Sequence, residues 1–238
     1  MEQPLGFVRQ RFSPEGYLGL HLTLGLLLVI LAAWGFSEIA ENLAPTSSMV
    51  ALDHAVSRWC DDHSQPLAVS LARIVTQGGS VLFLSIASLL GAALLAWRRA
   101  WDWLLAFTLT MLGGSLLNIL LKHFFHRHRP IFENPLVTLT SYGFPSGHTM
   151  GATLFYGLLA LFAIQAGRSA AKRSLIICVN LFIILAIGST RIYLGAHYLT
   201  DVLAAMVAGS GWLAFSWTAA DVYRRRRLRN LQKAVPAR

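Results

Sequence analysis

The chain has 238 residues, of which 55% are hydrophobic and only 13% are charged, and its formal net charge is +9. Soluble domains carry about 25% charged residues, so this composition excludes an ordinary soluble domain and favours a membrane protein. The length allows one domain or two small ones, and we expect a single domain over residues 1–238.

Six apolar stretches have close to the roughly 20 residues that a membrane-spanning helix needs. The first is longer than the roughly 7–15 apolar residues of a cleaved signal peptide, so it is expected to be a retained span. The sequence therefore predicts an all-α integral membrane protein, a bundle of six transmembrane helices over residues 17–36, 80–97, 101–121, 149–166, 175–190 and 199–220.

The longest polar region, residues 37–79, lies between the first two spans. Apolar residues recur in it at helical spacing, as in Leu67, Leu71 and Ile74, and Pro45 and Pro66 interrupt the pattern. This pattern favours short amphipathic helices at the membrane surface, in the first outer loop.

Lysine and arginine are distributed unevenly between the two faces that six spans define. Fourteen of the twenty lie on the side of the two termini, seven of them in the basic tail 221–238, and six lie on the other side. The positive-inside rule therefore places both termini in the cytoplasm of a multi-pass protein of the plasma (inner) membrane. Because the basic residues are spread over separate short loops, we expect no nucleic-acid partner.

Cations on the outer face run against this bias. Four of the six lie inside three polar clusters. Ionisable residues at membrane depth indicate a functional site. The connectivity places the first cluster after the third span, the second before the fourth and the third between the fifth and sixth. All three are therefore expected at the outer face, where a helix bundle can bring them together.

The first cluster contains Lys122 and Arg129, followed by Pro130. On a helix, residues seven apart share a face, so both cations could grip one phosphate, the arginine as a fork and the lysine as a point charge. The alternative is a basic anchor at the membrane interface. Three histidines lie in the same stretch but no cysteine or aspartate joins them, so we expect no metal site at His123, His126 and His128.

The second cluster, Pro145 to His148, leads directly into the fourth span. Ser146 and Gly147 at a helix N-terminus would offer backbone N–H groups and a hydroxyl to an anion. His148 beside that anion could protonate a leaving oxygen. The alternative is a serine N-cap with an interfacial histidine that has no chemical role.

The third cluster contains Arg191, His197 and Asp201. Residues four apart are neighbours on a helix, and a carboxylate bonded to one ring nitrogen makes the other a better base or nucleophile. Arg191 supplies a further phosphate-binding cation. The alternative is a capping pair at the start of the sixth span.

Taken together, the clusters resemble the type 2 phosphatidic acid phosphatase family, which includes bacterial undecaprenyl-diphosphate phosphatases. Its signature is Lys, six residues, Arg-Pro; then Pro-Ser-Gly-His; then Ser-Arg, five residues, His, three residues, Asp. The chain matches it from Lys122 to Asp201, with Thr190 in place of the usual serine as the one departure. Threonine keeps the hydroxyl, so only fine positioning is affected.

The resemblance implies a role for each matching residue. His197 would attack phosphorus and form a phosphohistidine, Asp201 would orient it, and His148 would protonate the leaving group. No metal and no other cofactor would be required. The phosphate oxygens would be held by Lys122, Arg129, Ser146, Gly147 and Arg191.

The sequence thus predicts a lipid phosphatase of phospholipid metabolism whose partners are the bilayer and a membrane lipid phosphate. Candidate substrates are undecaprenyl diphosphate, phosphatidic acid, phosphatidylglycerophosphate and a lipid A phosphate. A lipid-to-lipid phosphotransferase would use the same nucleophile and remains an alternative. A non-enzymatic anion or lipid transporter would explain buried cations but not the pairing of His197 with Asp201.

Overall fold

The computed structural model describes residues 19–131, 141–165 and 169–234, and all the regular structure in them is helical. Four cations used to orient the chain lie outside these residues: Arg9, Arg11, Arg168 and Arg238. The helices are α2 (Leu20–Glu41), α3 (Ser48–Asp62), α4 (Pro66–Thr76), the 3-10 turn η1 (Gln77–Gly79), α5 (Val81–Trp97), α6 (Trp101–Phe125), α7 (Gly147–Gln165), α8 (Ala170–Tyr193) and α9 (Leu199–Ala234).

Six helical segments are long and apolar enough to cross a membrane, which confirms the predicted number of spans. Five are single helices, α2, α6, α7, α8 and α9, and the other runs from Pro66 to Trp97 through α4, η1 and α5. The protein is therefore an all-helical multi-pass membrane protein, as predicted. Most of the other helices extend a few residues past the predicted spans. The second span starts at Pro66 instead of residue 80, because the stretch with Leu67, Leu71 and Ile74, expected at the membrane surface, forms α4 and continues through η1 into α5.

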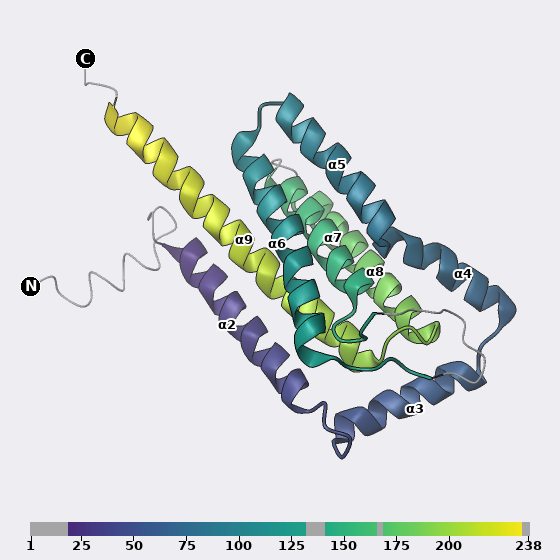
Figure 1. Ribbon diagram of the computed structural model, residues 1–238. Coiled ribbons are helices and arrows are strands. Elements are labelled where there is room, and N and C mark those ends of the chain that lie inside the picture. Colours follow the sequence, from purple (N-terminus) through teal and green to yellow (C-terminus); the bar gives the residue numbers. More distant parts are fainter. Residues whose placement is uncertain (1–18, 132–140, 166–168, 235–238) are drawn as a thin grey trace, which may run out of the picture.

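The bundle is built around α7, which contacts α5, α6, α8 and α9 (Figure 1). In the most apolar stretch of α7, 39% of the residues are buried, compared with 6% in that of α2. α2 lies along α9, and α5 lies along α6 at the other side of the bundle (Figure 1). The outer helices expose leucine and isoleucine, such as Leu28, Ile30 and Leu89, as expected of a surface that faces lipid.

A hydrophobic core fills the space between α5, α6, α7 and α9. Its members include Phe107, Met150, Leu154 and Leu158, each less than 8% exposed. Small residues let these helices approach closely, since a Cβ on Gly114 would overlap the side chain of Leu154. The core thereby fixes how the ends of α6, α7 and α9 lie relative to one another.

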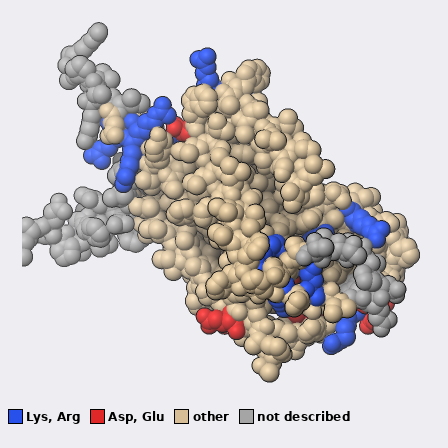
Figure 2. All heavy atoms as spheres, in the orientation of Figure 1, with Lys and Arg blue, Asp and Glu red and all other residues tan. Residues whose placement is uncertain are grey.

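The bundle has two chemically different ends. At one, which we call the motif end, α6 finishes and α7 and α9 begin; at the other, the tail end, α2 begins and α9 finishes (Figure 1). α3 lies across the motif end (Figure 1). Lysine and arginine gather towards both ends, with a belt free of charged side chains between them on the face shown (Figure 2).

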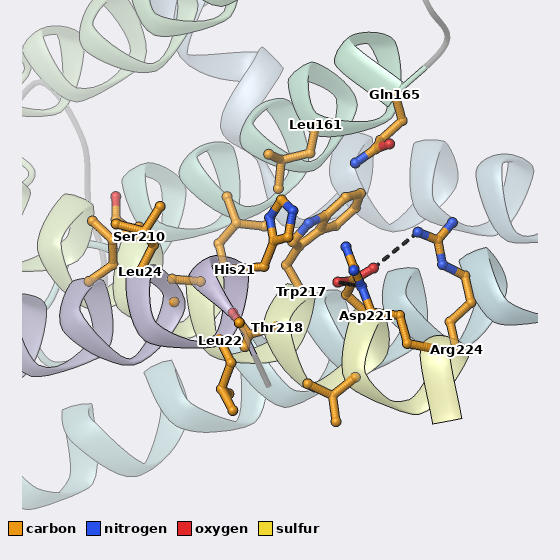
Figure 3. Close-up of a pocket in the computed structure, with 17 residues that line it drawn as sticks. His21, Leu22, Leu24, Leu161, Gln165, Ser210, Trp217, Thr218, Asp221 and Arg224 are labelled. Carbon is orange, nitrogen blue, oxygen red and sulfur yellow. Dashed lines mark hydrogen bonds and ion pairs between the residues drawn. The ribbon is translucent and has the colours of Figure 1, made fainter. Parts of the chain in front are cut away.

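Residues 221–234 of the basic tail are helical and continue α9 to Ala234. Asp221 pairs with Arg224 and Arg225 at 3.0 and 2.7 Å, and Arg227 pairs with Asp102 at 2.9 Å. These i,i+3 and i,i+4 pairs favour helix beyond the apolar span. A cavity of about 440 Å³ lies beside them between α2, α7 and α9, with Leu161 and Trp217 in its wall (Figure 3).

Candidate active site

All three motifs lie at the motif end. The first begins in the last turn of α6, the second starts α7, and the third joins α8 to α9. Direct contacts connect them: Arg129 of the first reaches the ring of His197 in the third, and the backbone N–H of Ser146 in the second donates to the carbonyl of Asp201 at 3.0 Å. The structure therefore brings together residues that are up to 79 positions apart in the sequence.

His197 lies at the centre of this arrangement and is 2% exposed. Its Nε2 lies 3.1 Å from a guanidinium nitrogen of Arg129, and its Nδ1 lies 3.4 Å from Oδ2 of Asp201. Arginine can only donate, so Nε2 is the acceptor and Nδ1 carries the proton that faces the carboxylate. Burial lowers the pKa of His197 from 6.5 to about 4, although Asp201 acts in the opposite direction.

Asp201 is fully buried and lies in the first turn of α9. Its Oδ2 also accepts from the backbone N–H of Tyr198, at 2.9 Å, as an acidic residue at the third helical position commonly does. His197 itself precedes the helix. Gly195 adopts φ = 66°, and the backbone N–H groups of Ala196 and His197 both donate to the carbonyl of Arg191. This turn, rather than a shared helix, sets the distance between histidine and carboxylate.

The first motif is not helical throughout, contrary to the geometry considered for Lys122 and Arg129. α6 ends at Phe125, and His126 adopts the left-handed conformation at φ = 49°. Pro130 contributes, since it cannot supply the N–H of a continuing helix and disfavours helical geometry in the residue before it. Arg129 therefore reaches the site from a non-helical segment, not from two turns further along α6.

Both cations of the first motif are held by carbonyl groups in this structure. Lys122 Nζ donates to the carbonyl of Tyr142 at 2.6 Å. Arg129 donates to the carbonyls of Ser141 and Ala196 at 2.7 and 2.5 Å. Burial lowers the pKa of Arg129, although Asp201 opposes this effect. The carbonyls orient both side chains but neutralise neither charge, so the positive potential around His197 remains available to an anion.

The second motif places a helix N-terminus beside these cations. Ser146 is fully buried, and its Oγ accepts from the backbone N–H and hydroxyl of Thr149, at 3.4 and 3.0 Å, so it caps α7. Gly147 begins α7 close to Lys122, whose Cε would lie 3.8 Å from a Cβ at that position. His148 is half-buried and lies within electrostatic range of Lys122, Arg191 and His197.

Arg191 is 4% exposed near the end of α8. One of its guanidinium nitrogens donates to Thr76 Oγ1 at 3.0 Å, whereas its buried Nε has no hydrogen-bond partner within the described residues. An unpaired buried donor on a cation is costly. The phosphate of a substrate is the kind of group that would satisfy it.

Two of the three histidines of the first motif, His123 and His126, have contacts outside the group around His197. His123 Nδ1 lies 2.8 Å from the carbonyl of Ile119, and the rings of His123 and His126 pack against Tyr142. Within the described ranges, no three histidine, cysteine, aspartate or glutamate side chains cluster as metal ligands would.

A sequence model of the PAP2 superfamily matches residues 103–225. The chain belongs to this superfamily. The resemblance drawn from the three motifs is thereby confirmed, and the matched residues contain all three motifs.

Relatives and solved structures agree with this assignment. Phosphatidylglycerophosphatase B of Bacillus subtilis (strain 168) is 34% identical over 167 residues, which cover 69% of this chain and 81% of the relative. The crystal structure of the transmembrane PAP2-type phosphatidylglycerolphosphate phosphatase from Bacillus subtilis superposes with a TM-score of 0.66 at 28% identity, covering 88% of this chain and 98% of that one. Aquifex aeolicus LpxE superposes with a TM-score of 0.56 at 25% identity, covering 70% and 94%.

Sequence reasoning missed several residues that surround the PAP2 motifs. Arg127 contacts Asp201, and Asp53 contacts both Arg127 and Thr200, so helix α3 reaches the site. Thr76, at the end of α4, holds Arg191. Two signals were available. Arg127 is a cation on the face where cations are rare. Asp53 also falls three residues after Val50 on the buried side of an amphipathic helix, where a carboxylate needs a partner.

Proposed function

We propose that the protein hydrolyses a phosphomonoester or diphosphate on a membrane lipid, without a metal ion, through a phosphohistidine formed on His197. PAP2 membership makes the chain a lipid phosphatase. The finer reaction rests on the surroundings of His197. Its Nδ1 faces a buried carboxylate, its Nε2 faces Arg129, and Lys122 and Arg191 lie in the same field of charge. An imidazole so arranged is a nucleophile aimed at an anion.

Two steps account for hydrolysis. In the first, Nε2 of His197 attacks phosphorus, the P–N bond forms, and the P–O bond to the lipid breaks while His148 gives its proton to the leaving oxygen. In the second, water attacks the phosphohistidine and passes a proton to His148. The P–N bond then breaks, which releases phosphate and returns His197 to its neutral form. Asp201 stabilises the positive charge that the ring acquires as it attacks.

Phosphate binding is assigned to the cations and to the start of α7. Lys122, Arg129 and Arg191 neutralise the phosphate oxygens as charge shifts in the transition state. The backbone of Gly147 and the hydroxyl of Ser146 lie at the positive end of the α7 dipole. On binding, the phosphate would replace the carbonyl groups that Lys122 and Arg129 contact in this structure.

The first candidate substrate is phosphatidylglycerophosphate, because phosphatidylglycerophosphatase B is a relative over most of its length. The lipid-facing leucines of the outer helices suit a substrate whose acyl chains stay in the bilayer. We also propose that residues 1–238 form one domain of the inner membrane. Both termini would be cytoplasmic and the motif end would face outward, because most lysine and arginine lie on the side of the tail.

Phosphate release by the detergent-purified protein tests this proposal. Wild type and His197→Ala are compared in the presence of EDTA on phosphatidylglycerophosphate, phosphatidic acid and undecaprenyl diphosphate. We expect phosphate release to persist in EDTA and to be lost in His197→Ala. The rates of release from the three lipids show which substrate is preferred. Activity lost to EDTA, or retained by His197→Ala, would overturn the mechanism. Release that requires a lipid acceptor would identify a phosphotransferase instead.

A further inference from the structure

The PAP2 motifs leave one buried charge network unassigned. Arg127 lies between Lys122 and Arg129 in the sequence, and its side chain contacts α3 and α9. One guanidinium nitrogen donates to Oδ1 of Asp201 at 2.6 Å, and the other donates to Oδ2 of Asp53 at 2.8 Å. Arg127 therefore bridges two fully buried carboxylates, and its own side chain is only 13% exposed.

The contact with Arg127 fixes how Asp201 is oriented. Because Arg127 holds Oδ1, the other oxygen of the carboxylate is the one that faces Nδ1 of His197 and the backbone N–H of Tyr198. The guanidinium also lies over the ring of Tyr198, 4.7 Å from its centroid, which limits its movement. A rotation of the carboxylate would therefore break its contact with Arg127 together with its contacts to His197 and Tyr198.

Asp53 anchors the network from outside the motifs. It lies on α3, is 1% exposed, and accepts from the backbone N–H and the hydroxyl of Thr200, at 2.9 and 2.5 Å. Thr200 immediately precedes Asp201. Asp53 therefore accepts hydrogen bonds both from the first turn of α9 and from Arg127. Each of its carboxylate oxygens accepts at least one hydrogen bond from the protein, so its position is fixed by internal donors in place of water.

Charge balance gives Asp53 a second effect on His197. Alone, the positive charge of Arg127 would offset the negative charge of Asp201 and weaken its support for the imidazole. With Asp53 on the other side of Arg127, the side chains of Asp53, Arg127 and Asp201 together carry a net charge of about −1. This negative charge favours the positive charge that His197 develops.

From these contacts we propose that Asp53 and Arg127 are positioning residues of the phosphatase reaction, a brace that aims Asp201 at His197 and preserves its charge. The inference rests on the proposed role of His197 as the nucleophile. It also gives the polar region 37–79 a function in catalysis, because α3 supplies half of the brace. Neither residue is expected to touch the phosphate.

The test compares four purified variants with wild type: Asp53→Asn, Arg127→Met, the double variant, and Asp62→Asn as a matched control at the exposed end of the same helix. We expect kcat for phosphate release from phosphatidylglycerophosphate to fall about 10- to 100-fold in each brace variant, since small displacements of catalytic groups cost this much. KM should change less than about threefold, and Asp62→Asn should match wild type. The loss in the double variant should be smaller than the product of the two single losses, because Asp53 and Arg127 both act on the orientation and charge of Asp201.

The pH dependence of kcat separates positioning from a general loss of structure. Asp53→Asn leaves the charge of Arg127 unbalanced and should move the acid limb to lower pH, whereas Arg127→Met removes that charge and should move it to higher pH. The other titratable or charged groups around His197 are unchanged in both variants: Lys122, Arg129, His148, Arg191, Tyr198, Asp201 and His54, which packs on Tyr198.

The outcomes are distinguishable. With His197→Ala inactive, any one of three results would overturn the brace. These are wild-type kcat in both single variants, acid limbs of the pH profile that coincide with that of wild type, and losses that multiply in the double variant. An active His197→Ala would instead overturn the proposed function on which the brace depends. Thermal midpoints close to that of wild type, measured in the same detergent, would exclude unfolding as the cause of a lower kcat. Arg127→Lys keeps the charge but not the two-pronged guanidinium, so it should recover only part of kcat.

Discussion

Oδ2 of Asp201 lies 3.4 Å from Nδ1 of His197, and both side chains are almost completely buried. The distance is longer than that of a well-formed hydrogen bond, and Nδ1 has no hydrogen-bond partner in the part of the chain that the structure describes. On its Nδ1 side this histidine therefore faces a single carboxylate, while Arg129 contacts Nε2 on the other side. The consequence can be measured by removing the charge of that carboxylate alone.

Asp201→Asn should lower kcat by about 1,000-fold or more while changing KM little, because the amide keeps the shape but cannot stabilise a positively charged ring. The measurement is phosphate release in EDTA. Asp221→Asn is the control, since Asp221 is paired with Arg224 and Arg225 at the tail end. Equal losses in the two variants would point to a general effect on folding and contradict the assignment.

Protonation of His197 should limit activity only in acid. Burial lowers its pKa to about 4, so the ring is neutral and nucleophilic at pH 5 to 7, and activity should fall as the pH drops through about 4. An unperturbed histidine would lose activity near pH 6.5. The check is the pH profile of kcat, with the ionisation of the free lipid phosphate measured separately. An acid limb near 6.5 after that correction would contradict a buried, neutral nucleophile.

The helices and motifs were predictable because their signals are local. Apolar stretches define spans wherever they occur, and the turn before His197 was compatible with the spacing that the motif requires. The brace was not predictable, because Asp53 and Arg127 are 74 residues apart and nothing in either segment specifies the other. The non-helical path from His126 to Arg129 was not predictable for a related reason, because His126 adopts the left-handed conformation in a stretch that contains no glycine.

Thr76→Val tests whether α4 positions Arg191. The substitution keeps the volume of the side chain but removes the hydroxyl that accepts from the guanidinium at 3.0 Å. A hydrogen bond to a charged group contributes about 1.5–3 kcal/mol, so we expect KM for the lipid phosphate to rise about 10-fold or more, with a smaller change in kcat. Thr76→Ser, which keeps the hydroxyl, should behave as wild type. A Val variant with unchanged KM would show that Arg191 does not depend on Thr76.

Gly147→Ala should reduce phosphate binding without unfolding the protein. The added methyl group would lie 3.3 Å from Oδ1 of Asn118 and 3.8 Å from Cε of Lys122, so it narrows the space beside the start of α7. Gly147 is the first residue of α7, where alanine is also compatible with a helical backbone, so the thermal midpoint should stay close to that of wild type. We expect KM to rise about 10-fold in phosphate-release assays. Gly35→Ala is the matched control on α2, where the new Cβ would meet only Val207 at 3.7 Å; a comparable rise in KM in that variant would contradict a local effect at Gly147.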